Sequence, residues 1–137
     1  MLNLTTWIQN PDKSQRDFIL IDGEFIPTHN LASRSEASEK IFDIESAGGE
    51  FYRKNGLRIV RYKSSYLVKL QTSKLDNSGR SMPIIMLVEN YGEESDSQLR
   101  SVIMKTLEKS KYEIKEDCIN QILSQINQNL LNLKKKR

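Results

Sequence analysis

The stretch that decides the fold runs from Phe51 to Gln71 and reads "FYRKNGLRIVRYKSSYLVKLQ". After Asn55-Gly56 it alternates apolar with polar residues, breaks at "KSS" and alternates again. Alternation is typical of β-strands, because successive side chains of a strand point to opposite faces. Asn-Gly is the preferred two-residue turn of a β-hairpin, since both of its positions tolerate a positive φ. The stretch therefore predicts three antiparallel strands, at about 50–54, 57–62 and 66–72.

Two neighbouring segments extend the predicted sheet. In "FILIDGEFIP", Asp22-Gly23 separates two short apolar runs, which predicts a second hairpin with strands at about 17–21 and 24–27. "PIIMLVE", residues 83–89, is a nearly continuous apolar run, as in a strand that is buried on both faces. These strands together predict an antiparallel meander of about five or six strands.

The residues between the predicted strands give weaker signals. Residues at about 35–42 are rich in Ser, Ala and Glu, which favours either a short helix or a surface loop. "KLDNSGRSMP" is a polar connection, and its Gly79 and Arg80 suggest a loop whose backbone N–H groups cradle an anion. It lacks the spacing of a P-loop, so a plain hairpin loop is the favoured interpretation.

After Tyr91 the apolar residues recur at the spacing of an α-helix. A first helix is predicted from about residue 95, because Leu99, Val102, Ile103 and Leu107 share one face. A second is predicted at about 117–133, followed by the basic tail 134–137. Its apolar face consists of Ile119, Ile122, Leu123, Ile126, Leu130 and Leu133. The sequence therefore predicts one α+β domain over residues 1–137, mostly β up to about residue 90, with a two-helix hairpin that packs on the sheet or projects from it.

The amino-acid composition indicates a cellular compartment and a type of genome for the protein. The 137 residues contain one cysteine, Cys118, so no internal disulfide forms, as is usual in a reducing compartment. No apolar run is long enough to span a membrane, and the N-terminal residues do not resemble a signal peptide. We therefore expect a cytoplasmic protein that has no membrane contact. Abundant Ile, Asn, Lys and Ser with little Ala suggest an AT-rich bacterial or phage genome.

Charge is unevenly distributed along the chain. Residues 1–50 carry 9 acidic and 4 basic side chains, whereas residues 51–81 carry 8 basic and 1 acidic. A basic segment interleaved with tyrosines is suited to phosphate contact and base stacking. The residues predicted to bind nucleic acid or another anion are Arg53, Lys54, Arg58, Arg61, Lys63, Lys69 and Arg80, with Tyr62 and Tyr66 as stacking candidates. The alternative is an ordinary wet sheet face, neutralised within the fold by the acidic first fifty residues.

Signals for catalysis are weak. His29 is the only histidine, and a solvated loop histidine is the common case. Cys118 opens the second helix, and core packing is its favoured role. Glu113-Ile114-Lys115 matches the Glu-x-Lys element of metal-dependent nucleases, but such a short match arises often by chance. We therefore expect no catalytic residue, no metal and no cofactor.

The helix at 117–133 offers a second surface for a partner. The residues predicted to form a partner face are Ile119, Ile122, Ile126, Leu130 and Leu133, interrupted by Asn129. Together with the basic hairpin, this face favours a non-catalytic accessory or adaptor subunit of a bacterial or phage assembly. Its expected partners are a larger protein, together with DNA, RNA or an acidic protein surface. Association with further copies of itself, as a homo-oligomer, is left open. A small metal-dependent nuclease or toxin, and a structural oligomerisation module, are the alternatives.

Overall fold

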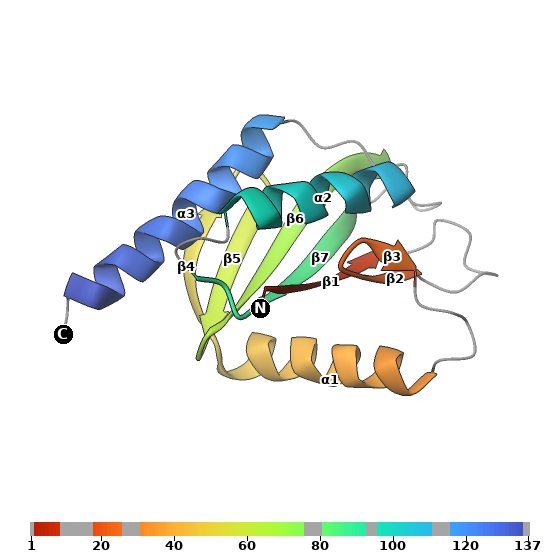
Figure 1. The fold of residues 1–137 in the computed structure, drawn as a ribbon, viewed down its shortest axis with the longest axis horizontal. Helices are drawn as coiled ribbons and strands as arrows, with labels where there is room; N and C mark the ends of the chain where they lie inside the picture. Colours follow the sequence, from red (N-terminus) through yellow and green to blue (C-terminus); the bar gives the residue numbers. More distant parts are fainter. Residues whose placement is uncertain are drawn as a thin grey trace.

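The computed structural model describes residues 2–8, 18–25, 31–75, 81–92, 96–110 and 116–135, and it confirms the predicted α+β class (Figure 1). The described strands form a seven-stranded sheet in the order β3-β2-β1-β7-β6-β5-β4. Every pair of neighbouring strands is antiparallel, so two meanders, β1–β3 and β4–β7, join where β1 pairs with β7. The strands are β1 (Asn3–Ile8), β2 (Phe18–Ile21), β3 (Glu24–Phe25), β4 (Gly49–Lys54), β5 (Leu57–Tyr62), β6 (Ser65–Leu75) and β7 (Ser81–Glu89).

Tight turns connect the two strands of each hairpin, as the sequence predicts. Asp22 and Gly23 have φ angles of 51° and 85°, and Asn55 and Gly56 have φ angles of 53° and 79°. These left-handed values are those that the favoured hairpin turns require. The turn between β5 and β6 begins at Lys63, whose φ is 54°, where the sequence breaks at "KSS". Turn chemistry therefore fixes the register of β4, β5 and β6.

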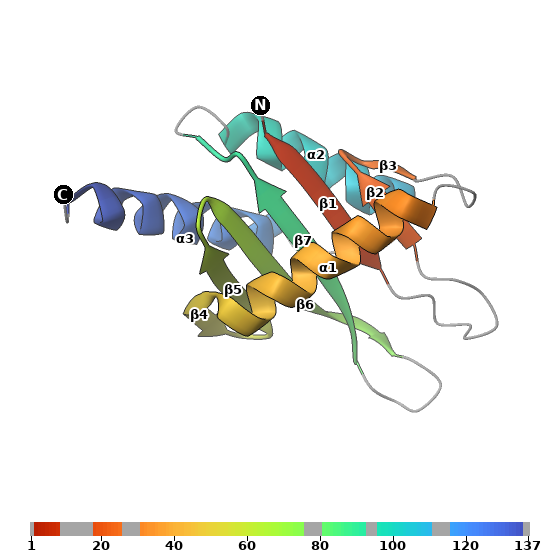
Figure 2. The same cartoon turned by 90° about the horizontal axis from the view of Figure 1, so that it is seen from below.

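Helices lie on both faces of the sheet. Helix α1 (Leu31–Ala47) crosses one face, and α2 (Asp96–Ser110) and α3 (Glu116–Lys135) cover the other (Figure 2). The predicted pair of C-terminal helices thus packs on the sheet. Within the described ranges, none of the helices is long and apolar enough to cross a membrane.

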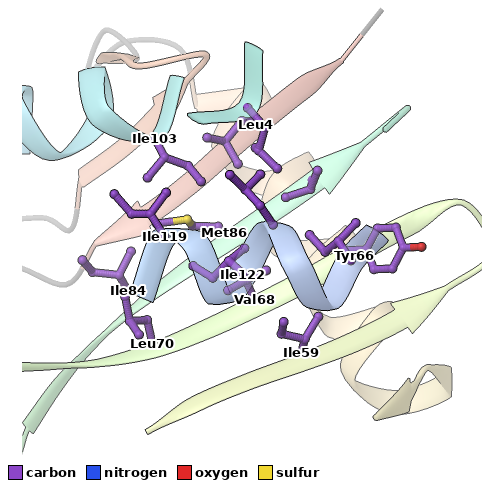
Figure 3. Close-up of a cluster of buried hydrophobic side chains, with 14 of the residues drawn as sticks. Leu4, Ile59, Tyr66, Val68, Leu70, Ile84, Met86, Ile103, Ile119 and Ile122 are labelled. Carbon is purple, nitrogen blue, oxygen red and sulfur yellow. The ribbon is translucent and has the colours of Figure 1, made fainter. Parts of the chain in front are cut away.

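The larger core lies between the sheet and the pair α2 and α3 (Figure 3). Ile59, Val68 and Met86 are cross-strand neighbours on β5, β6 and β7, and all three are fully buried. Ile103 of α2 and Ile122 of α3 pack in the same cluster. Burying side chains of this size contributes about 1.5–3 kcal/mol each, so this layer supplies most of the apolar stabilisation.

A smaller core lies under α1. Ile41 and Ile44 of α1 pack against Val60, Leu67 and Leu87 of the sheet. Met86 therefore faces one core and Leu87 the other, which confirms that β7 is buried on both faces.

Two elements differ from the prediction. Strand β1 was not predicted, because two adjacent threonines in "NLTTWI" interrupt the alternation, yet β1 lies inside the sheet between β2 and β7. Helix α1 was predicted only as a short helix or a loop at about 35–42, and it spans 17 residues. Its two buried positions among residues 39–47, Ile41 and Ile44, gave too weak a helical pattern.

Candidate binding surface

Three of the predicted basic residues form one row across the sheet. Arg53 on β4 lies opposite Arg58 on β5, which lies opposite Lys69 on β6. Directly opposed like charges repel each other. We refer to Arg53, Arg58 and Lys69 as the basic row. It lies on the face that α1 crosses.

Two carboxylates from the acidic first fifty residues neutralise much of the basic row. Glu50 Oε1 lies 2.7 Å from Arg53 Nε and 3.1 Å from Arg58 Nε, and Glu45 of α1 forms an ion pair with Lys69. The hydrogen bond from Arg53, helped by the charge of Arg58, lowers the pKa of Glu50, although desolvation opposes the shift. Burial lowers the pKa of Lys69. The cations of the basic row therefore form ion pairs within the molecule, with α1 through Glu45 and with β4 through Glu50.

Arg61 lies on the opposite face and is bound there to α3. Its Nη1 donates to Asn129 Oδ1 at 3.0 Å and its Nε donates to the backbone oxygen of Lys63 at 2.7 Å. The hydroxyl of Tyr66 donates to the same Asn129 oxygen at 3.1 Å. The guanidinium also lies 5.5 Å from the centroid of the Tyr66 ring. Arg61 thus ties the β5–β6 turn to α3.

The two tyrosines predicted to stack on bases lie in different surroundings. Tyr66 is 1% exposed, and its ring packs edge-to-face with Phe51 and Tyr91. This position leaves no exposed ring face for a base. Tyr62 is half-buried beside the α1 core, and Lys63 Nζ lies 5.2 Å from its ring centroid.

The remaining basic residues do not form a continuous patch. Lys54 and Lys63 are exposed and have no carboxylate partner among the described residues. They lie at opposite ends of β5, because Lys54 precedes the β4–β5 turn and Lys63 begins the β5–β6 turn. Arg80 lies outside the described residues. The structure therefore brings three of the predicted cations together and separates the others.

Most of the predicted partner face of α3 is used inside the molecule. Ile119, Ile122 and Ile126 are at most 1% exposed in the larger core, and Leu130 is half-buried against it. The physical reason is that the sheet itself covers this apolar side. The partner face predicted at these three positions is thus occupied by the sheet.

The C-terminal end of α3, in contrast to its first turns, extends past the sheet. Its last turns project beyond the edge strand β4 in both views (Figures 1 and 2). Here Leu131 is 53% exposed and Leu133 is 37% exposed. We refer to Leu130–Lys135 as the α3 tip. Leu133 belongs to the predicted partner face, whereas Leu131 does not, because Leu131 falls outside the apolar stripe that faces the core.

Among the described residues, hollows adjoin the helices at two places that bear on the predicted residues. One, of about 220 Å³, lies where the β4–β5 turn meets the start of α3 and is lined by Lys54, Asp117 and the half-buried Cys118, among others. The other, of about 630 Å³, lies between α2 and α3. Its polar residues Asp96 and Asn127 bond to each other, with Nδ2–Oδ distances of 2.8 and 2.9 Å. Both hollows thus adjoin residues with structural roles.

The structure does not describe the residues that the sequence suggests for metal-dependent catalysis. His29, Glu113 and Lys115 all lie outside the described residues. Within the part of the chain that the structure describes, no three His, Cys, Asp or Glu side chains gather closely enough to share a metal ion.

Comparison with known proteins gave no match: no family model, no curated protein and no solved structure is similar to this chain.

Proposed function

We propose that the chain is a non-catalytic binding module, an accessory or adaptor subunit of a cytoplasmic bacterial or phage assembly, that contacts an acidic protein surface through the α3 tip. The observation that carries the proposal is the exposure of Leu131 and Leu133 on a helix end that projects beyond the sheet. A helix end that extends past its own sheet leaves its apolar side chains available to a partner, and apolar anchors on a helix are a common mode of recognition.

The positive charge at the α3 tip indicates the sign of the charge on the partner's surface. Residues 118–137 contain four basic side chains, all at 134–137, and no Asp or Glu. Arg61 adds positive charge beside Asn129, because its Nη1 donates a hydrogen bond to the Asn129 side-chain oxygen. An acidic partner complements this field and avoids like-charge repulsion.

Nucleic-acid contact through the basic row is less well supported. Phosphates would compete with Glu45 and Glu50 for Arg53, Arg58 and Lys69, and counterion release favours binding only where cations are free to pair with phosphate. Tyr66 is also buried, so its ring is not available for stacking. An acidic protein is therefore the favoured class of partner.

The test is capture of a partner from the native host by the tagged, full-length chain. Leu131→Glu combined with Leu133→Glu should reduce capture about tenfold or more, because charge at an apolar contact is costly. Met104→Glu is the matched control, since Met104 is 52% exposed on α2. Capture should survive nuclease treatment and the control substitution. A partner that is retained by the tip variant, or lost after nuclease treatment, would contradict the proposal.

A further inference from the structure

The geometry points to a specific occupant of the α3 tip: the outer face of α1 in a second copy of this chain, centred on Phe42. This inference rests on the proposed function, because it identifies the acidic protein surface that the tip contacts. It assigns the chain a heterologous, head-to-tail self-association.

Phe42 is the most exposed large apolar side chain among the described residues, at 68%. It points away from the small core, because its neighbours Ile41 and Ile44 pack against the sheet instead. Most of the Phe42 ring is thus available to a second molecule. Aromatic side chains are enriched in the cores of protein interfaces, so Phe42 is suited to the centre of a contact.

Negatively charged side chains lie next to Phe42 on α1, whereas the α3 tip contains no carboxylate. Glu39 lies one helical turn before Phe42, Asp43 follows it directly, and both are exposed. Among the described side chains of α1, Lys40 supplies the one positive charge, and its Nζ lies 3.4 Å from Glu89. An apolar centre flanked by carboxylates on α1 thus complements an apolar centre with basic residues on the α3 tip.

The two surfaces cannot meet within one molecule. Helix α1 lies on one face of the sheet and α3 on the other (Figure 2). Contact between them therefore requires two copies. A reciprocal two-fold dimer would use both surfaces of each copy. In a head-to-tail contact, a pair of copies keeps one free α1 and one free α3 tip. Such a heterologous contact forms a ring if its rotation closes and an open chain if it does not.

Two other modes of self-association are less favourable. Two α3 tips in contact would bring positive charge against positive charge, since neither contains a carboxylate. Addition of a strand at the β4 edge is opposed by the bulge between Glu50 and Tyr52 and by the charge of Arg53 and Lys54. The α1 to α3 contact remains the one with complementary charge.

The experiment measures the mass of the purified, full-length chain in solution as its concentration is raised. The wild-type chain should increase in mass, and added salt should weaken the association. Phe42→Glu alone and Leu131→Glu alone should each remain monomeric. Met104→Glu should associate like the wild type. All three positions are exposed, so circular dichroism should confirm that each variant is folded.

Mixing the two defective variants separates the proposed contact from the alternatives. The Phe42→Glu chain keeps an intact α3 tip, and the Leu131→Glu chain keeps an intact α1. Their mixture should therefore form a one-to-one dimer that grows no further. A contact between like surfaces, α1 with α1 or tip with tip, predicts either no association in the mixture or association in one variant alone. A reciprocal two-fold contact predicts a wild-type mass that stops at a dimer. Each of these results would overturn the inference.

The mass in solution tests self-association, and capture from the host tests partner contact through the α3 tip. A wild-type chain that stays monomeric at all concentrations overturns the self-association. If host capture nevertheless depends on Leu131 and Leu133, the proposed function stands with a different acidic partner. If neither association nor tip-dependent capture is observed, both are overturned.

Discussion

Asn129 shows how one polar residue decides the position of an amphipathic helix. Its side-chain oxygen accepts hydrogen bonds from both Arg61 and Tyr66, which come from β5 and β6. In the sequence it interrupts the apolar pattern of the helix and suggests a weak point. In the structure it is a half-buried acceptor that satisfies two donors at the edge of the core.

We expect Asn129→Ala to destabilise the fold by about 1–3 kcal/mol, because two donors lose a shared partner. Urea denaturation measures the change. Asn132→Ala is a matched control on the exposed side of α3 and should change stability by less than about 0.5 kcal/mol. Equal effects of the two substitutions would contradict the role given to Asn129.

Glu50 links the stability of the fold to pH. Its pKa lies below the ordinary value of 4.5, so the unfolded chain binds protons at a higher pH than the folded chain does. Its stabilising contribution is therefore complete well above pH 4.5 and is lost as the pH falls through the lowered pKa. The difference in Tm between wild type and Glu50→Gln should be largest at neutral pH and shrink in acid. A difference that grows on acidification would show that the ion pairs with Arg53 and Arg58 do not stabilise the fold.

Helix α3 has a buried part and a projecting part along its length. The turns that carry Ile119 and Ile122 are covered by the sheet, whereas the tip extends past it. Ile122→Ala should cost about 2–5 kcal/mol, because it leaves a cavity in the larger core. Leu131→Ala should change the free energy of unfolding by less than about 0.5 kcal/mol. A large effect at Leu131 in urea denaturation would mean that the tip is part of the core.

Sequence predicts an element well where local chemistry alone determines it. The hairpins follow from Asp22-Gly23 and Asn55-Gly56, whose positive φ angles are a local property. The spacing of Ile119, Ile122 and Ile126 predicts a buried helix face, yet it cannot tell whether a partner or the molecule's own sheet covers that face. Elements defined by long-range contacts are predicted poorly: β1 is not predicted, and α1 is predicted only as a short helix or a loop at about 35–42.

The candidate site was predictable only as a set of charges. The sequence identified the basic residues of 51–81 and the acidic first fifty residues, and it left open whether they neutralise each other. That outcome depends on which acids the fold brings near. Glu50 meets Arg53 and Arg58 through the pairing of β4 with β5. Glu45 meets Lys69 because α1 crosses the sheet there, and the sequence contains no local signal for this crossing.

For the whole molecule, the distribution of charge predicts poor phosphate binding by the basic row. Replacing a phosphate-contacting cation should reduce the slope of log affinity against log salt by about 0.9 on duplex DNA. We expect Arg58→Gln to leave that slope unchanged in a titration of labelled DNA. A slope reduced by about one would show that Arg58 reaches phosphate despite its pairing with Glu50.

The proposed function requires that the α3 tip is the surface by which this molecule contacts protein. A photo-reactive phenylalanine analogue at position 131, incorporated in living host cells and irradiated, reports such a contact. We expect discrete protein adducts from position 131 and none from the equally exposed position 104. No adduct at position 131, or the same adducts from both positions, would contradict it.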